Sequence, residues 1–250
     1  MKLVFFTLLI SVFSLSVYAE PRVIQSPDHK VNMLELYTSQ GCSSCPPAEQ
    51  WLNSLKTKEG LWTTFIPINF HVDYWDYIGW KDPFASASFS KRQRLYKHLK
   101  FARNVATPGF ILNGKGWNGW FYGQSPSWVN EPPSGDILAT LNGQSIEVAF
   151  TPKPQGREHL QSGALKVHIA ILGFDITTKV TGGENEGRDL SHDFVVLAHH
   201  SQPMITSEHE AMARMRLPDA SGFNSKQQGI VIWVAGASDP RPIQAAGDWL

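Results

Sequence analysis

Two short apolar runs in the first third of the chain predict neighbouring buried strands. They are "VNMLELY" (residues 31–37) and "FIPINFHVD" (65–73), whose length and apolar character are typical of strands. Between them, residues 48–56 place apolar side chains on one face at helical spacing. A second helix is expected over 82–100, with Asp82 as its N-cap. The order strand, helix, strand, helix predicts an α/β unit.

The pattern then changes toward strands. "GFILNG" (109–114) predicts a strand, with a second short strand across 117–123 and a closing helix near "DILATL" (136–141). From about residue 144, four segments alternate or run apolar with Gly, Pro and Asn between them, which indicates strands with little helix. These segments are "QSIEVAF", "ALKVHIAILGF", "DFVVLAH" and "QGIVIWVAG". The polar segment 181–192 is expected to be an exposed loop.

The predicted fold class is therefore α/β (α+β). We place an α/β domain at 20–143 and a β-rich C-terminal region at 144–250. With only two cysteines, the protein must be held together by a packed core and not by a disulfide framework.

The first 19 residues have the features of a secretory signal. Lys2 precedes an apolar stretch that ends in Val17-Tyr18-Ala19, just before Glu20. An uncleaved membrane anchor is the alternative, although the run is short for spanning a bilayer. We expect a periplasmic or secreted protein with no stable membrane association after cleavage.

The charge balance bears on possible partners. The chain has 22 basic and 22 acidic residues, so it carries no net field that would attract it to nucleic acid or anionic lipid. We expect no nucleic-acid partner.

The two cysteines supply the main candidate chemistry. Cys42 and Cys45 form a C-x-x-C in "TSQGCSSCPP", at the predicted end of a strand and start of a helix. The first cysteine is expected at the helix N-terminus and the second one turn into the helix. A helix N-terminus favours negative charge and so lowers a thiol pKa. Cys42 is the candidate nucleophile and Cys45 the resolving thiol. Two alternatives stay open: a copper(I) site completed by His71, and an inert disulfide.

Four other residues are candidates for the same site. Glu35, in the strand before the cysteines, could accept the proton of the resolving thiol, or it could be a salt-bridged glutamate. His71 and Asp73 follow the second strand and could relay protons or contact substrate, while His71 could equally be a buried, hydrogen-bonded histidine. Trp75 could form part of an aromatic lip for substrate or pack against the next helix.

Several blocks of the sequence resemble a known bacterial family. "LELYTSQGCSSCPPAE", "FHVDYWDYIGWKDPFASASFSKRQRLY", "TPGFILNG" and "GRDLSHDFVV" are similar to successive blocks of the secreted family catalogued as domain of unknown function 1223. That family is assigned to the thioredoxin-like superfamily, so the resemblance implies a thioredoxin-like domain. It also implies a cis peptide bond at Thr107-Pro108, opposite the cysteines, with the Thr107 backbone pairing with substrate.

The leading functional hypothesis is thiol–disulfide exchange with protein or small-molecule thiols and disulfides, without a cofactor. A metal-binding module using the same thiols and a non-catalytic binding scaffold are the alternatives.

The signal prediction can be tested by mass. If residues 1–19 are removed on export, the intact mass of the exported protein should correspond to a chain starting at Glu20. An exported protein that retains residues 1–19 would contradict the predicted cleavage.

Overall fold

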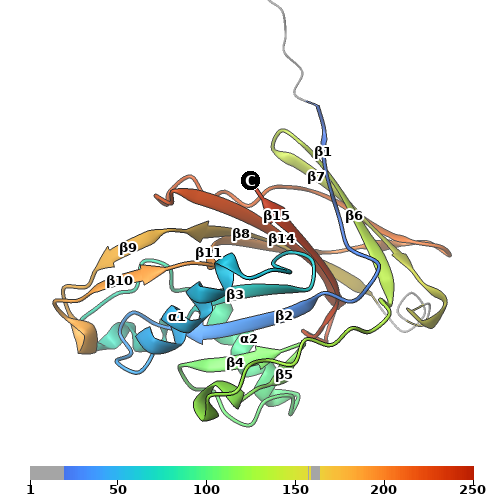
Figure 1. Ribbon diagram of the computed structural model, residues 1–250. Coiled ribbons are helices and arrows are strands. Elements are labelled where there is room, and N and C mark those ends of the chain that lie inside the picture. The colour runs from blue at the N-terminus through green and yellow to red at the C-terminus, as the bar shows by residue number, and fades with distance from the viewer. Residues whose placement is uncertain (1–19, 157, 159–163) are drawn as a thin grey trace, which may run out of the picture.

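The computed structural model of the chain describes residues 20–156, 158 and 164–250 (Figure 1). The predicted signal, residues 1–19, lies outside the described residues. In the part of the chain that is described, no helix has both the length and the apolar character needed to cross a membrane.

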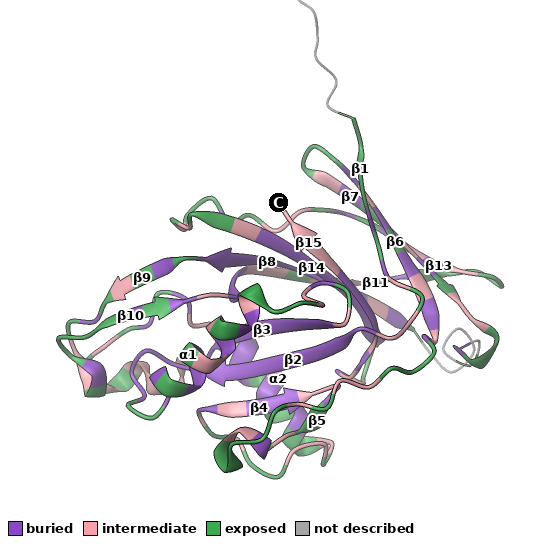
Figure 2. Ribbon diagram, in the orientation of Figure 1, coloured by how far each residue is buried: buried purple, intermediate pink, exposed green. Residues whose placement is uncertain are grey.

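Eight of the described strands form one mixed sheet. Its order is β15–β14–β8–β11–β3–β2–β4–β5, in which β2 and β11 both run parallel to β3 and the other neighbours pair antiparallel. The bounds are β2 Asn32–Thr38, β3 Phe65–His71, β4 Gly109–Leu112, β5 Lys115–Gly116, β8 Leu165–Phe174, β11 Val195–Pro203, β14 Gln227–Gly236 and β15 Pro242–Trp249. The two runs predicted as buried strands are thus β2 and β3, and every residue of both is buried (Figure 2).

Two α-helices cover opposite faces of this sheet. Successive strand residues point to opposite faces. On β2, Thr38 contacts Glu49 of α1 (Pro46–Asn53), whereas Glu35 contacts Arg92 of α2 (Ala87–His98). Short 3₁₀ helices lie in the connections: η1 Ser54–Thr57, η2 Asp73–Ile78, η3 Gly119–Tyr122, η4 Pro154–Gly156 and η5 Gly183–Asn185.

A second sheet packs against the β-rich part of the first. Among the described residues it contains β1 Arg22–Gln25, β6 Gly135–Asn142, β7 Ser145–Pro152, β13 Ala211–Arg216 and β12 Ile205–Thr206, in that spatial order. Buried and accessible positions alternate along β6 and β7, and the buried ones join a cluster with side chains of β8 and β14. A hairpin of β9 Ile176–Lys179 and β10 Asp189–His192 extends toward α1 (Figure 1). The mixed, β-rich fold class is therefore confirmed.

Three local predictions were wrong. Residues 136–141 form strand and not helix, because their apolar side chains alternate and pair with β7. The segment 117–123 contains η3, and the short strand β5 precedes it at Lys115–Gly116. Helix α2 begins at Ala87, not near 82, and its N-cap is Ser86, whose hydroxyl accepts the Ser88 N–H.

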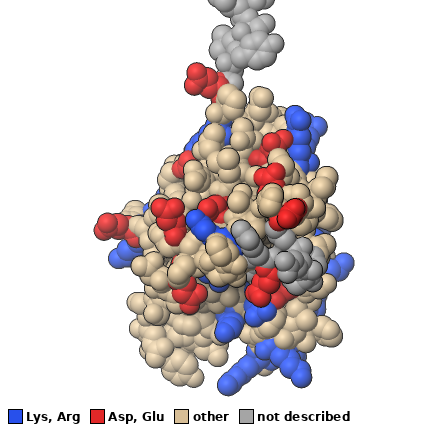
Figure 3. Space-filling model, turned by 90° about the vertical axis from the view of Figure 1, so that its right-hand side faces the viewer, with Lys and Arg blue, Asp and Glu red and all other residues tan. Residues whose placement is uncertain are grey.

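The predicted division at residue 143 falls in the turn between β6 and β7, which pair along their whole length. Strands from both sides of residue 143 also meet in the larger sheet, where β3 is parallel to β11. Acidic and basic side chains are interspersed over the face shown in Figure 3.

A buried ion pair fixes α2 to the sheet. Arg92 donates from Nε and Nη2 to the two oxygens of Glu35, at 2.9 and 2.8 Å. The hydroxyls of Tyr37 and Tyr96 also donate to Glu35, each at 2.6 Å. Arg92 donates further to the carbonyl of Pro240, between β14 and β15. Because this carboxylate has four donors, its burial is compensated.

Removing the Arg92 cation should destabilise the fold. Arg92→Met should lower the free energy of unfolding by about 3–5 kcal/mol, since it leaves the Glu35 carboxylate buried with its cation removed. Urea denaturation at neutral pH measures this. Lys153→Met, which breaks the exposed pair with Asp136, is the matched control and should change little. Equal losses for the two variants would contradict the assignment.

Candidate functional site

The two cysteines form a disulfide in the turn between β2 and α1. Cys45 is the N-cap of α1, and Pro46 and Pro47 occupy the first two helical positions. Cys42 lies three residues earlier, and its N–H donates to the carbonyl of Ser39. The prediction that the first cysteine lies at the helix N-terminus is therefore corrected, because the second one does.

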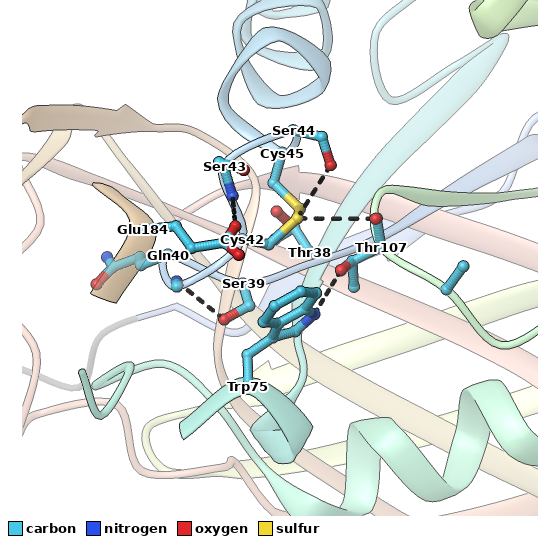
Figure 4. The surroundings of a disulfide bond; sticks show 12 residues. Thr38, Ser39, Gln40, Cys42, Ser43, Ser44, Cys45, Trp75, Thr107 and Glu184 are labelled. Atoms are coloured by element: carbon cyan, nitrogen blue, oxygen red, sulfur yellow. Dashed lines mark hydrogen bonds between the residues drawn. A yellow bond between two sulfur atoms is a disulfide. The ribbon is translucent and has the colours of Figure 1, made fainter. Parts of the chain in front are cut away.

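The sulfur of Cys42 faces two oxygen atoms (Figure 4). The Ser44 hydroxyl lies 3.3 Å from it, and the carbonyl oxygen of Thr107 lies 3.7 Å from it. The Trp75 indole N–H donates to the Thr107 hydroxyl at 2.7 Å. The Thr107-Pro108 peptide bond is cis, as expected. The structure thus brings Trp75, Thr107 and Pro108 to the cysteines, which are themselves 1% and 0% exposed.

Two predicted site residues lie elsewhere. Glu35 points to the α2 face of β2, away from α1, and its oxygens are occupied by Arg92 and two tyrosines. This position does not suit a proton acceptor for Cys45. Asp73 accepts a hydrogen bond from the Ser90 hydroxyl and is thereby held to α2.

A different buried carboxylate lies on the cysteine side of the sheet. Glu49, one helical turn after Cys45, is 2% exposed. Its Oε1 accepts the Thr38 hydroxyl at 2.7 Å, and its Oε2 contacts Nδ1 of His192 at 2.5 Å. Burial opposes ionisation, but His192, His71 and the Thr38 hydroxyl outweigh it and lower the pKa of Glu49 to about 2. Glu49 is therefore ionised at neutral pH.

The hydrogen bonds around His192 assign its tautomer. The indole N–H of Trp80 donates to the side-chain oxygen of Gln40, so the Gln40 NH₂ group faces Nε2 of His192 at 3.0 Å. Nε2 must accept this bond, which places the ring proton on Nδ1, where it is donated to Glu49.

His71 is held on one side only. Its Nδ1 lies 2.7 Å from Oδ2 of Asp82, which also accepts the Gln40 N–H. Its Nε2 has no hydrogen-bond partner among the described residues and lies 3.9 Å from Oε2 of Glu49. Burial would lower the pKa of His71, but the carboxylates of Asp82 and Glu49 outweigh it and raise that pKa. His71 is thus a buried histidine between two carboxylates.

Glu49, His71 and His192 offer ligand-type atoms within 4.8 Å of one another, as a metal site would. The details favour a hydrogen-bonded cluster. The 2.5 Å between Glu49 and His192 is shorter than the roughly 3.3 Å that separates two ligands of a tetrahedral zinc with bonds near 2.0 Å. A metal-bound imidazole also donates from its second nitrogen, whereas His192 accepts there. In the copper(I) alternative His71 would be a third ligand, and its Nδ1 and Nε2 lie near the carboxylates of Asp82 and Glu49, respectively.

The polar segment 181–192 is not the exposed loop that was predicted. It contains η5 and β10, and Asn185 within it is fully buried. The Asn185 amide donates to the carbonyls of Gln40 and Cys42, at 2.8 and 2.9 Å, while the Glu184 carboxylate accepts the Ser43 N–H at 2.9 Å. Sequence reasoning missed both residues, as it missed Gln40, Glu49 and His192. A glutamate one turn after Cys45 was the only signal available for the buried cluster.

The Glu49 cluster predicts a pH dependence. A carboxyl whose folded pKa is depressed from 4.5 to about 2 stabilises the fold above pH 4.5, and that contribution is lost as the pH falls toward 2. The free energy of unfolding of wild type should therefore exceed that of Glu49→Gln by a few kcal/mol near neutral pH, because a tenfold change in the acid dissociation constant of a carboxyl corresponds to about 1.4 kcal/mol. This difference should shrink as the pH falls toward 2. Denaturation at a series of pH values measures this, with the exposed Glu59→Gln as control. A difference that is constant with pH would be inconsistent with an ionised Glu49.

The comparisons with known proteins agree with this architecture. A crystal structure of an Agrobacterium tumefaciens protein matches at 23% identity with a TM-score of 0.58, covering 88% of this chain and 93% of that one. HBP35 of Porphyromonas gingivalis matches at 12% identity with a TM-score of 0.59, covering 90% of this chain and 76% of that one. Both likenesses concern the fold alone. No curated protein matches the sequence. The profile of the family described as "protein of unknown function (DUF1223)" matches residues 33–235, and the chain therefore belongs to that family.

Proposed function

We propose that the protein is a secreted or periplasmic, thioredoxin-like thiol–disulfide oxidoreductase that acts through Cys42 and Cys45. One observation carries the proposal. The closed C-x-x-C disulfide lies where a parallel strand leads into a helix, with the sulfur of Cys42 against the Thr107 carbonyl. Its partners would be protein or small-molecule thiols and disulfides.

The arrangement around β2 supports the thioredoxin-like part of the proposal. The strands β3, β2, β4 and β5 lie in that order, the first pair parallel and the next two antiparallel. The helices α1 and α2 contact opposite faces of β2. This agrees with the core that the family resemblance implies.

The proposed exchange is a pair of displacements at sulfur. From the reduced state, the Cys42 thiolate attacks a substrate disulfide, forming a mixed disulfide and releasing one substrate sulfur as a thiolate, which takes up a proton. The Cys45 thiolate then attacks the sulfur of Cys42, which re-forms the Cys42–Cys45 bond and releases the second substrate thiol. Two electrons pass to the substrate. In this scheme Trp75 orients Thr107, whose backbone borders the reacting sulfur.

A second candidate function is a non-catalytic scaffold with an inert disulfide. The observation that favours it is the low exposure of the sulfurs, 1% for Cys42 and 0% for Cys45. Exchange would then require the side chains that cover Cys42 to move, and reactivity distinguishes the two candidates.

Trapping tests the proposed function. Cys45→Ser should accumulate mixed disulfides through Cys42 when incubated with disulfide-bearing proteins, since no resolving thiol remains. Non-reducing electrophoresis followed by mass spectrometry identifies the adducts. Cys42→Ser is the matched control and should trap far less, because the proposed scheme makes Cys42 the attacking thiol and Cys45 the resolving one. Absence of adducts, together with failure of Cys42 to react with a small alkylating reagent after reduction, would favour the scaffold.

A further inference from the structure

A segment from the far end of the sequence holds the cysteine turn. Residues 182–188, here called the clamp turn, follow β9 and precede β10. Asn185, which is fully buried, donates to the carbonyls of Gln40 and Cys42 across more than 140 positions of sequence. These two bonds thus fix the backbone that carries Cys42. Figure 4 shows a further contact of the clamp turn, between Glu184 and the Ser43 N–H.

The clamp turn is itself tightly held. The Arg188 guanidinium donates to Oδ1 of Asn185 at 2.6 Å, which orients the Asn185 amide toward the cysteine turn. Gly182 packs against the carbonyl of Gly79 so closely that a Cβ atom there would collide with backbone. Gly183 has a φ of +73°, a conformation that favours glycine. The Arg188–Asn185 bond and the close contact of Gly182 with Gly79 therefore both restrain the clamp turn.

The same turn places a negative charge next to Cys42. Oε2 of Glu184 accepts the N–H of Ser43, the amide that immediately follows Cys42, at 2.9 Å. This bond lowers the pKa of Glu184, so the group is a carboxylate at neutral pH. The Ser43 N–H, which could otherwise stabilise a Cys42 thiolate, is thereby occupied. The group that occupies it is itself an anion.

The helix N-terminus offers few donors to compensate. Pro46 and Pro47 have no N–H, and the N–H groups of Ala48 and Glu49 donate to the Cys45 carbonyl. Among the described residues, the hydroxyl of Ser44, 3.3 Å from the Cys42 sulfur, is the side-chain group in position to donate to it.

The other charged groups around the cysteine turn do not supply a cation that would stabilise a Cys42 thiolate. Carboxylates come from the clamp turn (Glu184), from α1 (Glu49) and from the segment before α2 (Asp82). The basic groups are already engaged, His71 with Asp82 and Arg188 with Asn185. Within the described residues, no basic side chain hydrogen-bonds to either sulfur.

We propose that the clamp turn sets the redox poise of the Cys42–Cys45 couple, with Glu184 disfavouring the Cys42 thiolate and so stabilising the disulfide. The inference rests on the proposed function and gives it a direction. A couple whose thiolate is disfavoured has a low reduction potential, as the opposite case of a strongly stabilised thiolate has a high one. The substrates are then disulfides: the dithiol form passes two electrons to a substrate disulfide, yielding the enzyme disulfide and two substrate thiols. A dithiol reductant must regenerate the enzyme.

The test changes the charge of Glu184 and keeps its shape. Glu184→Gln retains an oxygen for the Ser43 N–H and should raise the reduction potential. The equilibrium constant with dithiothreitol should shift three- to tenfold toward the enzyme dithiol, about 15–30 mV. The pKa of Cys42, from the pH dependence of alkylation, should fall. Both effects should diminish in 1 M salt, because Glu184 lies at the surface and the screening length there is about 3 Å.

Glu186→Gln is the matched control, since Glu186 is an exposed glutamate two positions away whose side chain does not hydrogen-bond to the cysteine turn. It should leave the potential and the pKa of Cys42 unchanged. Equal values for wild type and Glu184→Gln, or equal shifts in the two variants, would overturn the proposal. The potential is read with a small dithiol, so it is independent of the trapping of protein adducts. Absence of adducts together with an unreactive Cys42 would therefore reject the proposed function, while an unchanged potential with a reactive Cys42 would reject only the role of the clamp turn.

Discussion

The contact between Glu49 and His192 joins the first turn of α1 to the β9–β10 hairpin. A carboxylate buried in the first turn of α1 needs partners, and one of them is an imidazole from β10, 143 positions later. This bond holds the β9–β10 hairpin against α1, and the clamp turn that joins the two strands then reaches the cysteine turn. The surroundings of the C-x-x-C disulfide are consequently completed by residues from both parts of the chain.

The polar network extends beyond that pair, and its members restrain one another. Gln40 receives the Trp80 indole on its oxygen and donates to His192, while its backbone N–H binds Asp82. Asp82 in turn holds His71. Gln40, His192, Asp82 and His71 are all buried, so losing one partner would leave another unsatisfied in a medium of low polarity. The residue two positions before Cys42 is thereby fixed through its side chain and its backbone.

Local sequence patterns predicted the strands better than their partners. Continuous apolar runs identified β2 and β3 because both faces of these strands are covered. A closing helix was expected near residues 136–141, but these residues pair with β7 and form a strand. Asp82 is a residue type that often caps helices, but its carboxylate binds His71 and the Gln40 N–H. The helix has Ser86 as its N-cap instead.

Within the site, contacts close in sequence to a motif were predictable and long-range ones were not. Cys42 and Cys45 were identified by spacing, and Thr107, Pro108 and Trp75 through resemblance or position. Of the two roles considered for Glu35, the structure shows the salt-bridged one. The sequence could not decide between them, because the alternation of side chains along a strand does not say which helix covers each face. Glu184 and Asn185 occur in a segment whose composition is that of an exposed loop. Their bonds to the cysteine turn, and the burial of Asn185, distinguish them from ordinary loop residues.

Burial and charge act on Cys42 in the same direction. Burial raises a thiol pKa because it removes the water that would solvate the thiolate, and the Glu184 carboxylate adds electrostatic repulsion. The Ser44 hydroxyl opposes both, but a single neutral donor contributes only on the order of 1 kcal/mol. A thiolate that forms under these conditions is more nucleophilic than one of lower pKa, since nucleophilicity rises with basicity. The surroundings that stabilise the disulfide therefore also suit a reduced Cys42 to attack another disulfide, which is the direction of exchange proposed for this protein.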